Sequence, residues 1–359
     1  MNESTGFRPV RTVAGDDDTV RLVKPTEPAA AAPPVAPPVA KSSGGTPLWA
    51  GLGVAIGVAI GGAGLYFWPT KPPPAPVPPV AVVQPPPAPV PRIPIVDADA
   101  NTVLTRAVTS MTIYRLTENP SILVFDFPTL LQQGRMLDRI AAYVEKADTP
   151  RERLLDDVEL EHSVRTIGET PQGYYYGHDY GADSLAHFFR LVDRDKVFLN
   201  EDERLLRQVL MQEGWFTPGL KGGLISLPVV GADRNITSAA RSAILKHELA
   251  HGEYFANPDF AQHVHSFWTT LLTQAERDGI RKFLISQGYD GANAELMENE
   301  AQAYLIFTND PQFFSPQIVG MSADRRAEIQ HNFHSGMKPG WLKDFLTPQL
   351  PPRRSADRR

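Results

Sequence analysis

The stretch TSAARSAILKHELAHGEYFANP, residues 237–258, is the strongest structural signal in this chain of 359 residues. Thr237 or Ser238 can cap the first turn of a helix, because a side-chain oxygen there accepts a hydrogen bond from an unpaired backbone N–H. Asn257-Pro258 is a typical stop signal, since proline cannot continue a helix. The stretch therefore predicts one helix over residues 238–256.

Two histidines in this predicted helix are spaced for shared chemistry. His247 and His251 are four residues apart, so their side chains lie on the same face, one turn apart. Ile244 before them and Phe255 after them put the pair on or beside a buried stripe. Such a pair can bind one metal ion, and Glu248 beside them can act as a general base. The alternative is a pair of solvated histidines on a helix surface.

A catalytic zinc site needs a third protein ligand. Residues 294–307 form a second helical stretch with three candidates, Glu295, Glu298 and Glu300. Glu300 shares its face with Met297 and other apolar residues, whereas Glu295 lies on a polar face and Glu298 is intermediate. Because a carboxylate on an inward face needs a metal or an ion pair, we predict that Glu300 is the third ligand.

These motifs resemble the gluzincin branch of the zinc metallopeptidases. The resemblance rests on His247, Glu248 and His251, followed on a downstream helix by Asn299 and Glu300. It covers roughly residues 215–310. It implies a zincin-like core with a small sheet, an active-site helix and a ligand helix, and it implies Zn²⁺ as the cofactor.

The chain departs from the family pattern at two positions. Tyr304 stands where well-known members have an Asp that supports the first His, and Glu253 stands where a hydrophobic residue is usual. Tyr304 is a candidate donor to the oxyanion of a tetrahedral intermediate, or a support for His247. His331 and His334 are further catalytic candidates, with surface histidines as the alternative.

The resemblance also implies an edge strand just before the active-site helix, to which a peptide substrate adds as another strand. The apolar run from Gly223 to Gly231 is the candidate, and Pro228 suits an edge strand better than a central one. The alternative is an ordinary core strand.

The wider pattern predicts an α+β, mostly helical, zincin-like domain over residues 98–348. Strands are expected at residues 121–127 and 196–199. Helices are expected at residues 97–117, 129–147, 201–212, 238–256, 259–272, 273–287, 293–308 and 323–335.

The first quarter of the chain differs in composition, because residues 1–97 hold 21 of the 34 Pro. Residues 1–46 are predicted to be a disordered tail. Residues 47–68 carry no charge and, at about 33 Å as a helix, are long enough to cross a membrane. Residues 69–97 hold 13 Pro and predict an extended linker. Residues 349–359 are predicted to be a second disordered tail.

The predicted membrane span sets expectations for location and assembly. The five basic residues of the first tail favour a cytoplasmic N-terminus in a single-pass inner-membrane protein. The remaining domain would then lie in the periplasm. Gly53, Gly57 and Gly61 share one face and would allow a homodimer of close-packed helices, with a span that has no specific partner as the alternative.

Two global features exclude whole classes of function. The chain has no Cys, which excludes disulfides, thiolate metal sites and a Cys nucleophile. Its net charge of −6 argues against a nucleic-acid partner.

The leading hypothesis is therefore a membrane-anchored zinc hydrolase that cleaves peptide bonds in a peptide or protein substrate. Glu248 would activate a water on the zinc ion and pass its proton to the leaving amine. The alternative is a tethered envelope-binding or scaffold module whose zinc site is structural or vestigial. A zinc hydrolase of other amide bonds, such as those of cell-envelope material, is a third hypothesis.

Overall fold

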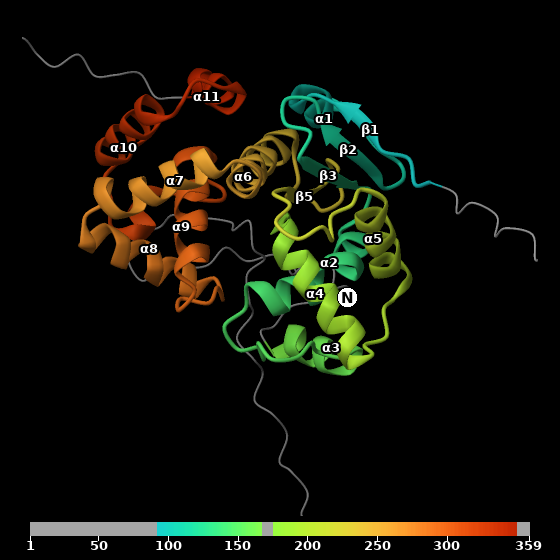
Figure 1. Ribbon diagram of the computed structural model, residues 1–359. Helices are drawn as coiled ribbons and strands as arrows, with labels where there is room; N and C mark the ends of the chain where they lie inside the picture. The colour runs from blue at the N-terminus through green and yellow to red at the C-terminus, as the bar shows by residue number, and fades with distance from the viewer. Residues whose placement is uncertain (1–91, 167–174, 350–359) are drawn as a thin grey trace, which may run out of the picture. The chain divides into compact units, whose positions relative to one another are not determined.

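The computed structural model describes residues 92–166 and 175–349, and these fold into an α+β domain around one five-stranded sheet (Figure 1). The strands are β1 (Val96–Ala98), β2 (Thr112–Leu116), β3 (Ile122–Phe127), β4 (His178–Gly181) and β5 (Gly223–Pro228). Their spatial order is β1-β2-β3-β5-β4. β1 pairs with β2 and β3 with β5 in parallel, whereas β2 with β3 and β4 with β5 are antiparallel.

Helices make up 57% of the described residues, which confirms the prediction of a mostly helical α+β fold. The α-helices are α1 (Ala100–Thr105), α2 (Leu130–Val144), α3 (Asp157–Thr166), α4 (Ala182–Asp195), α5 (Glu201–Gln212), α6 (Ser238–Ala256), α7 (Pro258–Ser266), α8 (Gln274–Ser286), α9 (Ala294–Gln302), α10 (Ala323–Gly336) and α11 (Trp341–Leu346). Shorter turns are the π-helical η1 (Phe267–Leu271) and η2 (Ala303–Phe307) and the 3₁₀-helical η3 (Pro316–Val319) and η4 (Thr347–Gln349).

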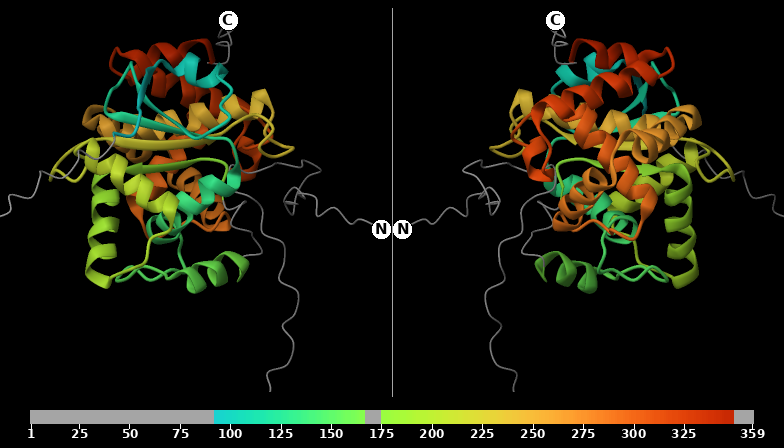
Figure 2. Two further views of the ribbon diagram at one scale, coloured as in Figure 1. Left: turned by 90° about the vertical axis from the view of Figure 1, so that its right-hand side faces the viewer. Right: turned by 90° about the vertical axis from the view of Figure 1, so that its left-hand side faces the viewer.

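Helix α6 packs across β3, β5 and β4, whereas α2 packs against β3 and β5 beside α4 and α5. The sheet thus separates α10 and α11 from α3, as Figure 2 shows. A Cβ on Gly223 would fall 2.6 Å from the backbone O of Gly252, so β5 and α6 meet with their backbones almost in contact. This close approach holds the histidine-bearing part of α6 against the sheet.

Several sequence predictions are confirmed along the chain. Helices α5 and α6 have the predicted bounds, and Thr237 caps α6 by accepting a hydrogen bond from Ala240 N (3.1 Å). Asn257 ends α6 and caps α7, whose first residue is Pro258.

Two local predictions are wrong. Residues 97–117 do not form one helix: Asp99 caps only the short helix α1, and the β-branched run from Thr112 pairs with β3 instead. Residues 196–199 are not a strand, because Lys196 adopts a left-handed conformation (φ 56°) that ends α4.

The Gly223–Gly231 run forms β5, but β5 is not the edge strand. It lies between β3 and β4 and is buried along its whole length. Pro228 is tolerated because it is the last residue of the strand, opposite Phe127. The edge strand on this side of the sheet is β4, for which the sequence shows no strand pattern.

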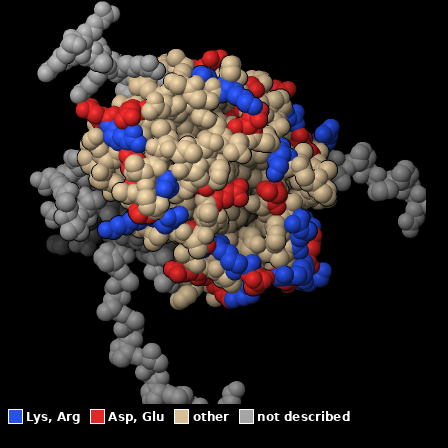
Figure 3. All heavy atoms as spheres, turned by 60° about the vertical axis from the view of Figure 1, so that its left-hand side comes forward, with Lys and Arg blue, Asp and Glu red and all other residues tan. Residues whose placement is uncertain are grey.

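The predicted first tail (1–46), the membrane span (47–68), its glycines and the linker up to residue 91 lie outside the described residues, as do residues 350–359. The first strand includes Val96 and Asp97, at the end of the predicted linker. Within residues 92–166 and 175–349, no helix combines the length and the apolar character that a membrane crossing requires. On the face in Figure 3, Lys and Arg side chains are interspersed with Asp and Glu side chains and do not gather into one basic surface.

Candidate metal centre

Three side chains from α6 and α9 converge beneath the sheet. His247 Nε2 lies 3.0 Å from His251 Nε2, and the two rings stand edge to face. The Glu300 carboxylate lies 3.8 Å from His247 Nε2 and 3.9 Å from His251 Nε2. Among the described residues, these three form the group of ligand atoms that could hold one metal ion.

The spacing of this group is close to that of a metal site. Ligand atoms about 2.1 Å from a tetrahedral zinc ion stand about 3.4 Å from one another. The two histidine nitrogens are 3.0 Å apart, Glu300 approaches them through different oxygens (Oε2 at 3.8 Å and Oε1 at 3.9 Å), and one ligand atom from each residue lies within 4.8 Å of the other two. Glu300 Oε2 is buried without a hydrogen-bond partner among the described residues, as expected for an atom whose partner is a cation.

The orientation of His247 is set by Thr308. The Thr308 hydroxyl donates to Ala303 O (3.0 Å), so it can only accept from His247 Nδ1 at 2.8 Å. This fixes the proton on Nδ1 and leaves the Nε2 lone pair for a metal. The sequence motif suggested Tyr304 for this supporting role, whereas Thr308 makes the contact.

The π-helical turn η2 explains why Thr308 takes that place. In a regular helix a residue eight positions after Glu300 would be rotated by about 80° away from it. The i→i+5 bond from Thr308 N to Ala303 O (3.0 Å) adds a residue to the turn and brings Thr308 back to the Glu300 face. Tyr304 instead packs its ring edge to face on His247, 4.8 Å between centroids.

The Nδ1 atom of His251 faces the edge strand. It lies 3.6 Å from Asp179 Oδ1 on β4, which is too far for a direct hydrogen bond. This Nδ1 has no hydrogen-bond partner among the described residues. Asp179 is thus an acidic neighbour of the ring, and nothing in the sequence pattern around it marks this proximity, because the pairing of β4 with β5 creates it.

Both histidines are kept neutral, which a metal ligand must be. Burial, followed by the neighbouring His251, lowers the pKa of His247 well below its usual value. Burial lowers the pKa of His251 to about 4.

Four buried carboxyl groups surround these rings. Burial raises the pKa of Glu145 to about 8 and that of Asp179 to about 7. Burial, and then the other acids of the cluster, raises the pKa values of Glu248 and Glu300 well above their usual range. The Lys146 ammonium acts in the opposite direction on Glu145 and Glu300 but does not outweigh burial. The cluster therefore favours a bound cation.

Glu248, the predicted general base, is 3% exposed and lies directly beside the loop that leads into β4. A Cβ on Gly177 would fall 2.0 Å from Glu248 Oε1, so any larger residue there would displace the Glu248 side chain. Glu248 Oε2 has no hydrogen-bond partner among the described residues.

The remaining candidates lie elsewhere. Glu298 pairs with His265 (3.0 Å) on α7, and Glu295 lines a separate pocket. His334 Nε2 bonds to Thr347 Oγ1 (2.9 Å), so its ring faces the C-terminal helices. His331 on α10 is half-buried and is not part of the ligand group among the described residues.

Glu253, the second departure from the family pattern, has a structural role. Its Oε2 accepts hydrogen bonds from Asn119 Nδ2 (2.8 Å) and Trp341 Nε1 (3.0 Å), and its Oε1 accepts one from Asn257 Nδ2 (2.7 Å). The carboxylate thus ties α6 to α11 and to the β2–β3 turn.

Comparisons with models of protein families, with curated proteins and with solved structures each found no match.

Proposed function

We propose that this chain is a zinc-dependent hydrolase, and that its substrates are peptides or proteins. The observation that carries the proposal is the convergence of His247, His251 and Glu300. Glu248 directly follows His247 on α6. The ligand types suit zinc, because imidazole nitrogens and one carboxylate are a common catalytic set.

Each residue has a defined task in this proposal. A zinc ion bound by the three ligands would act as a Lewis acid and lower the pKa of a coordinated water. Thr308 orients His247 through its Nδ1 atom, and Asp179 places a carboxyl group 3.6 Å from Nδ1 of His251. Glu248 takes up a proton at Oε2 and returns it to the leaving amine. Tyr304, whose ring packs on His247, is the candidate to stabilise an oxyanion.

The N-terminal quarter of the chain suggests where in the cell the enzyme would act. The uncharged span at residues 47–68 would anchor the chain in the inner membrane, and the Pro-rich linker would hold the domain in the periplasm. Peptides or amide bonds of the cell envelope would then be within reach.

The direct test compares Glu248→Gln with wild type in the purified full-length chain. We expect kcat/KM on a peptide library to fall by about 10²- to 10⁴-fold, while the zinc content stays unchanged. Glu328→Gln, an exposed change on α10, is the matched control. Equal activity of Glu248→Gln and wild type would refute the mechanism, and no cleavage by wild type would refute the peptidase assignment.

One observation favours a second candidate, a tethered scaffold with a structural zinc site. His247 and Glu248 are each 3% exposed, Glu300 is 1% exposed and His251 is fully buried. Closed sites of this kind hold folds together. If chelation unfolds the chain and no library peptide is cleaved, the scaffold function is the correct one.

A further inference from the structure

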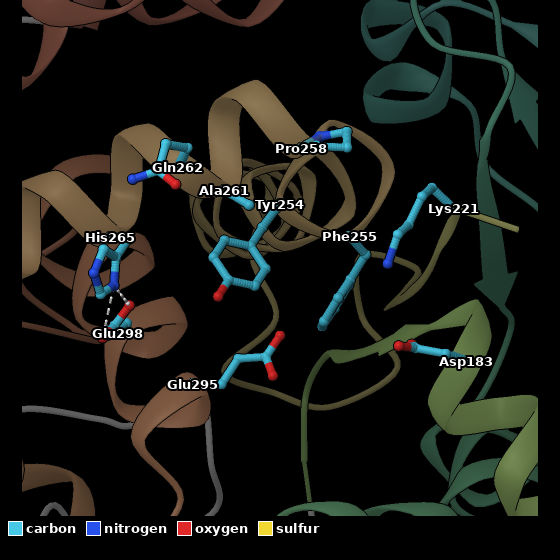
Figure 4. Close-up of a pocket in the computed structure, with 10 residues that line it drawn as sticks. All are labelled: Asp183, Lys221, Tyr254, Phe255, Pro258, Ala261, Gln262, His265, Glu295 and Glu298. Atoms are coloured by element: carbon cyan, nitrogen blue, oxygen red, sulfur yellow. Dashed lines mark hydrogen bonds and ion pairs between the residues drawn. The ribbon is translucent and has the colours of Figure 1, made fainter. Parts of the chain in front are cut away.

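A pocket of about 460 Å³ is lined by residues of α6, α7 and α9 (Figure 4). Its wall includes Tyr254 and Phe255, which follow His251 on α6 by three and four residues. One turn is about 5.4 Å along the helix axis. The opposite wall includes Asp183, two residues after the end of β4. The pocket and the candidate metal ligands therefore share α6, and they also share α9, which carries Glu295, Glu298 and Glu300.

The charges that line this pocket are mostly negative. Asp183, Glu295 and Glu298 carry carboxylates, and the exposed Lys221 carries the opposing ammonium. Glu298 already pairs with His265 (3.0 Å). Glu295 has neither a hydrogen bond nor an ion pair to a described residue, and burial followed by the charge of Asp183 raises its pKa. The carboxylates are thus close enough to repel each other.

The Tyr254 side chain is a second and independent indication of a ligand. It is 9% exposed, and its hydroxyl has no hydrogen bond to any described residue. Figure 4 shows this hydroxyl pointing into the pocket toward Glu295. Its ring stands edge to face with Phe255, 5.6 Å between centroids. The pocket thus combines apolar aromatic walls with unpaired acceptor groups.

This combination matches the side chain of lysine or arginine. Such a side chain has a long apolar stem that packs along aromatic rings and a cationic end that carries only hydrogen-bond donors. A neutral or acidic side chain would leave Glu295 unpaired or face it with a like charge.

We infer that this pocket is a substrate subsite that takes a basic side chain close to the cleaved bond. The inference rests on the proposed peptidase function. An extended peptide advances about 3.3–3.6 Å per residue, so a pocket one helical turn from the ligands receives a residue within two positions of that bond.

The test measures cleavage of matched peptides by the full-length chain. Each peptide carries lysine or norleucine at one of the two positions on either side of the cleaved bond. At one of these positions we expect kcat/KM to be at least about tenfold higher for lysine. Glu295→Gln should reduce this ratio to about 1, and Lys221→Gln should increase it. Glu328→Gln, a matched change outside the pocket, should keep the wild-type ratio.

The outcomes separate the two proposals. Cleavage without preference for lysine at any of the four positions overturns the subsite and leaves the peptidase function standing. If no peptide is cleaved, the peptidase function is wrong. Whether the pocket binds a cation is then tested by comparing the binding of a blocked Gly-Lys-Gly peptide with that of its norleucine counterpart. Tighter binding of the lysine peptide that Glu295→Gln abolishes supports the cation site, and equal binding overturns it.

Discussion

The two halves of helix α6 bury charged groups in opposite ways. In the first half, Arg241 donates to both oxygens of Asp126 (2.9 and 2.8 Å) and to Pro228 O (2.6 Å) and Val103 O (2.7 Å). In the second half, His247, Glu248 and His251 lie in a cluster of buried carboxyl groups, where burial and then the neighbouring acids raise the pKa values of Glu248 and Glu300. A buried charge whose partners are all present has a structural role. A cluster of buried carboxyl groups without a paired cation instead indicates a binding site for one.

The largest effect expected on stability is at Arg241. Arg241→Met leaves Asp126 buried without its partner, and we expect unfolding free energy to fall by about 3–5 kcal/mol. Denaturant unfolding measures this, with Lys246→Met on the same helix as the control, for which we expect less than about 1 kcal/mol. The loss should be the same with and without chelator. A loss seen only in the metal-loaded protein would contradict the contrast between the two halves.

The next effect is at the support of His247. Thr308→Val removes the hydroxyl that holds the Nδ1 proton, and we expect zinc affinity to weaken by about 10- to 100-fold. Competition with a chromophoric chelator measures it. Thr269→Val, at an exposed threonine that bonds only its own helix, should have no effect. An affinity within twofold of wild type at Thr308→Val would show that Thr308 does not orient the ring.

The smallest effect is a pH dependence. The pKa of Glu145 is raised to about 8 from 4.5, so the folded state favours the protonated form. This stabilisation is complete below pH 4.5 and is lost as the pH rises toward 8. In chelator, wild-type Tm should therefore fall between pH 5 and 8, and Glu145→Gln should reduce that fall by about 5 °C. Thermal unfolding of Glu161→Gln, an exposed control, should follow the wild-type profile. A profile of Glu145→Gln equal to wild type would contradict this.

The sequence could predict which three side chains come together, because the relevant geometry is local. His247 and His251 are related by one turn of α6, and the inward face of α9 selects Glu300 from three glutamates. Capping residues Thr237 and Asn257 likewise act within a few residues of themselves.

The supports of the site were not accessible, because long-range contacts create them. Asp179 comes within 3.6 Å of His251 only through β4, a four-residue strand without an alternating apolar pattern. Thr308 follows a π-helical turn, and a sequence pattern read with 3.6 residues per turn places it on the wrong face of the helix. Residues 97–117 were misjudged for a related reason, since pairing with β3 overrides their local helical spacing.

Metal content of the purified full-length chain tests the central claim most directly, with Glu300→Gln compared against Glu298→Gln. The two residues lie two positions apart on α9, but only Glu300 belongs to the ligand group. We predict about one zinc per chain in wild type and in Glu298→Gln, and close to none in Glu300→Gln. Wild-type protein that is free of zinc, or equal zinc content in the two variants, would contradict the metal centre described above.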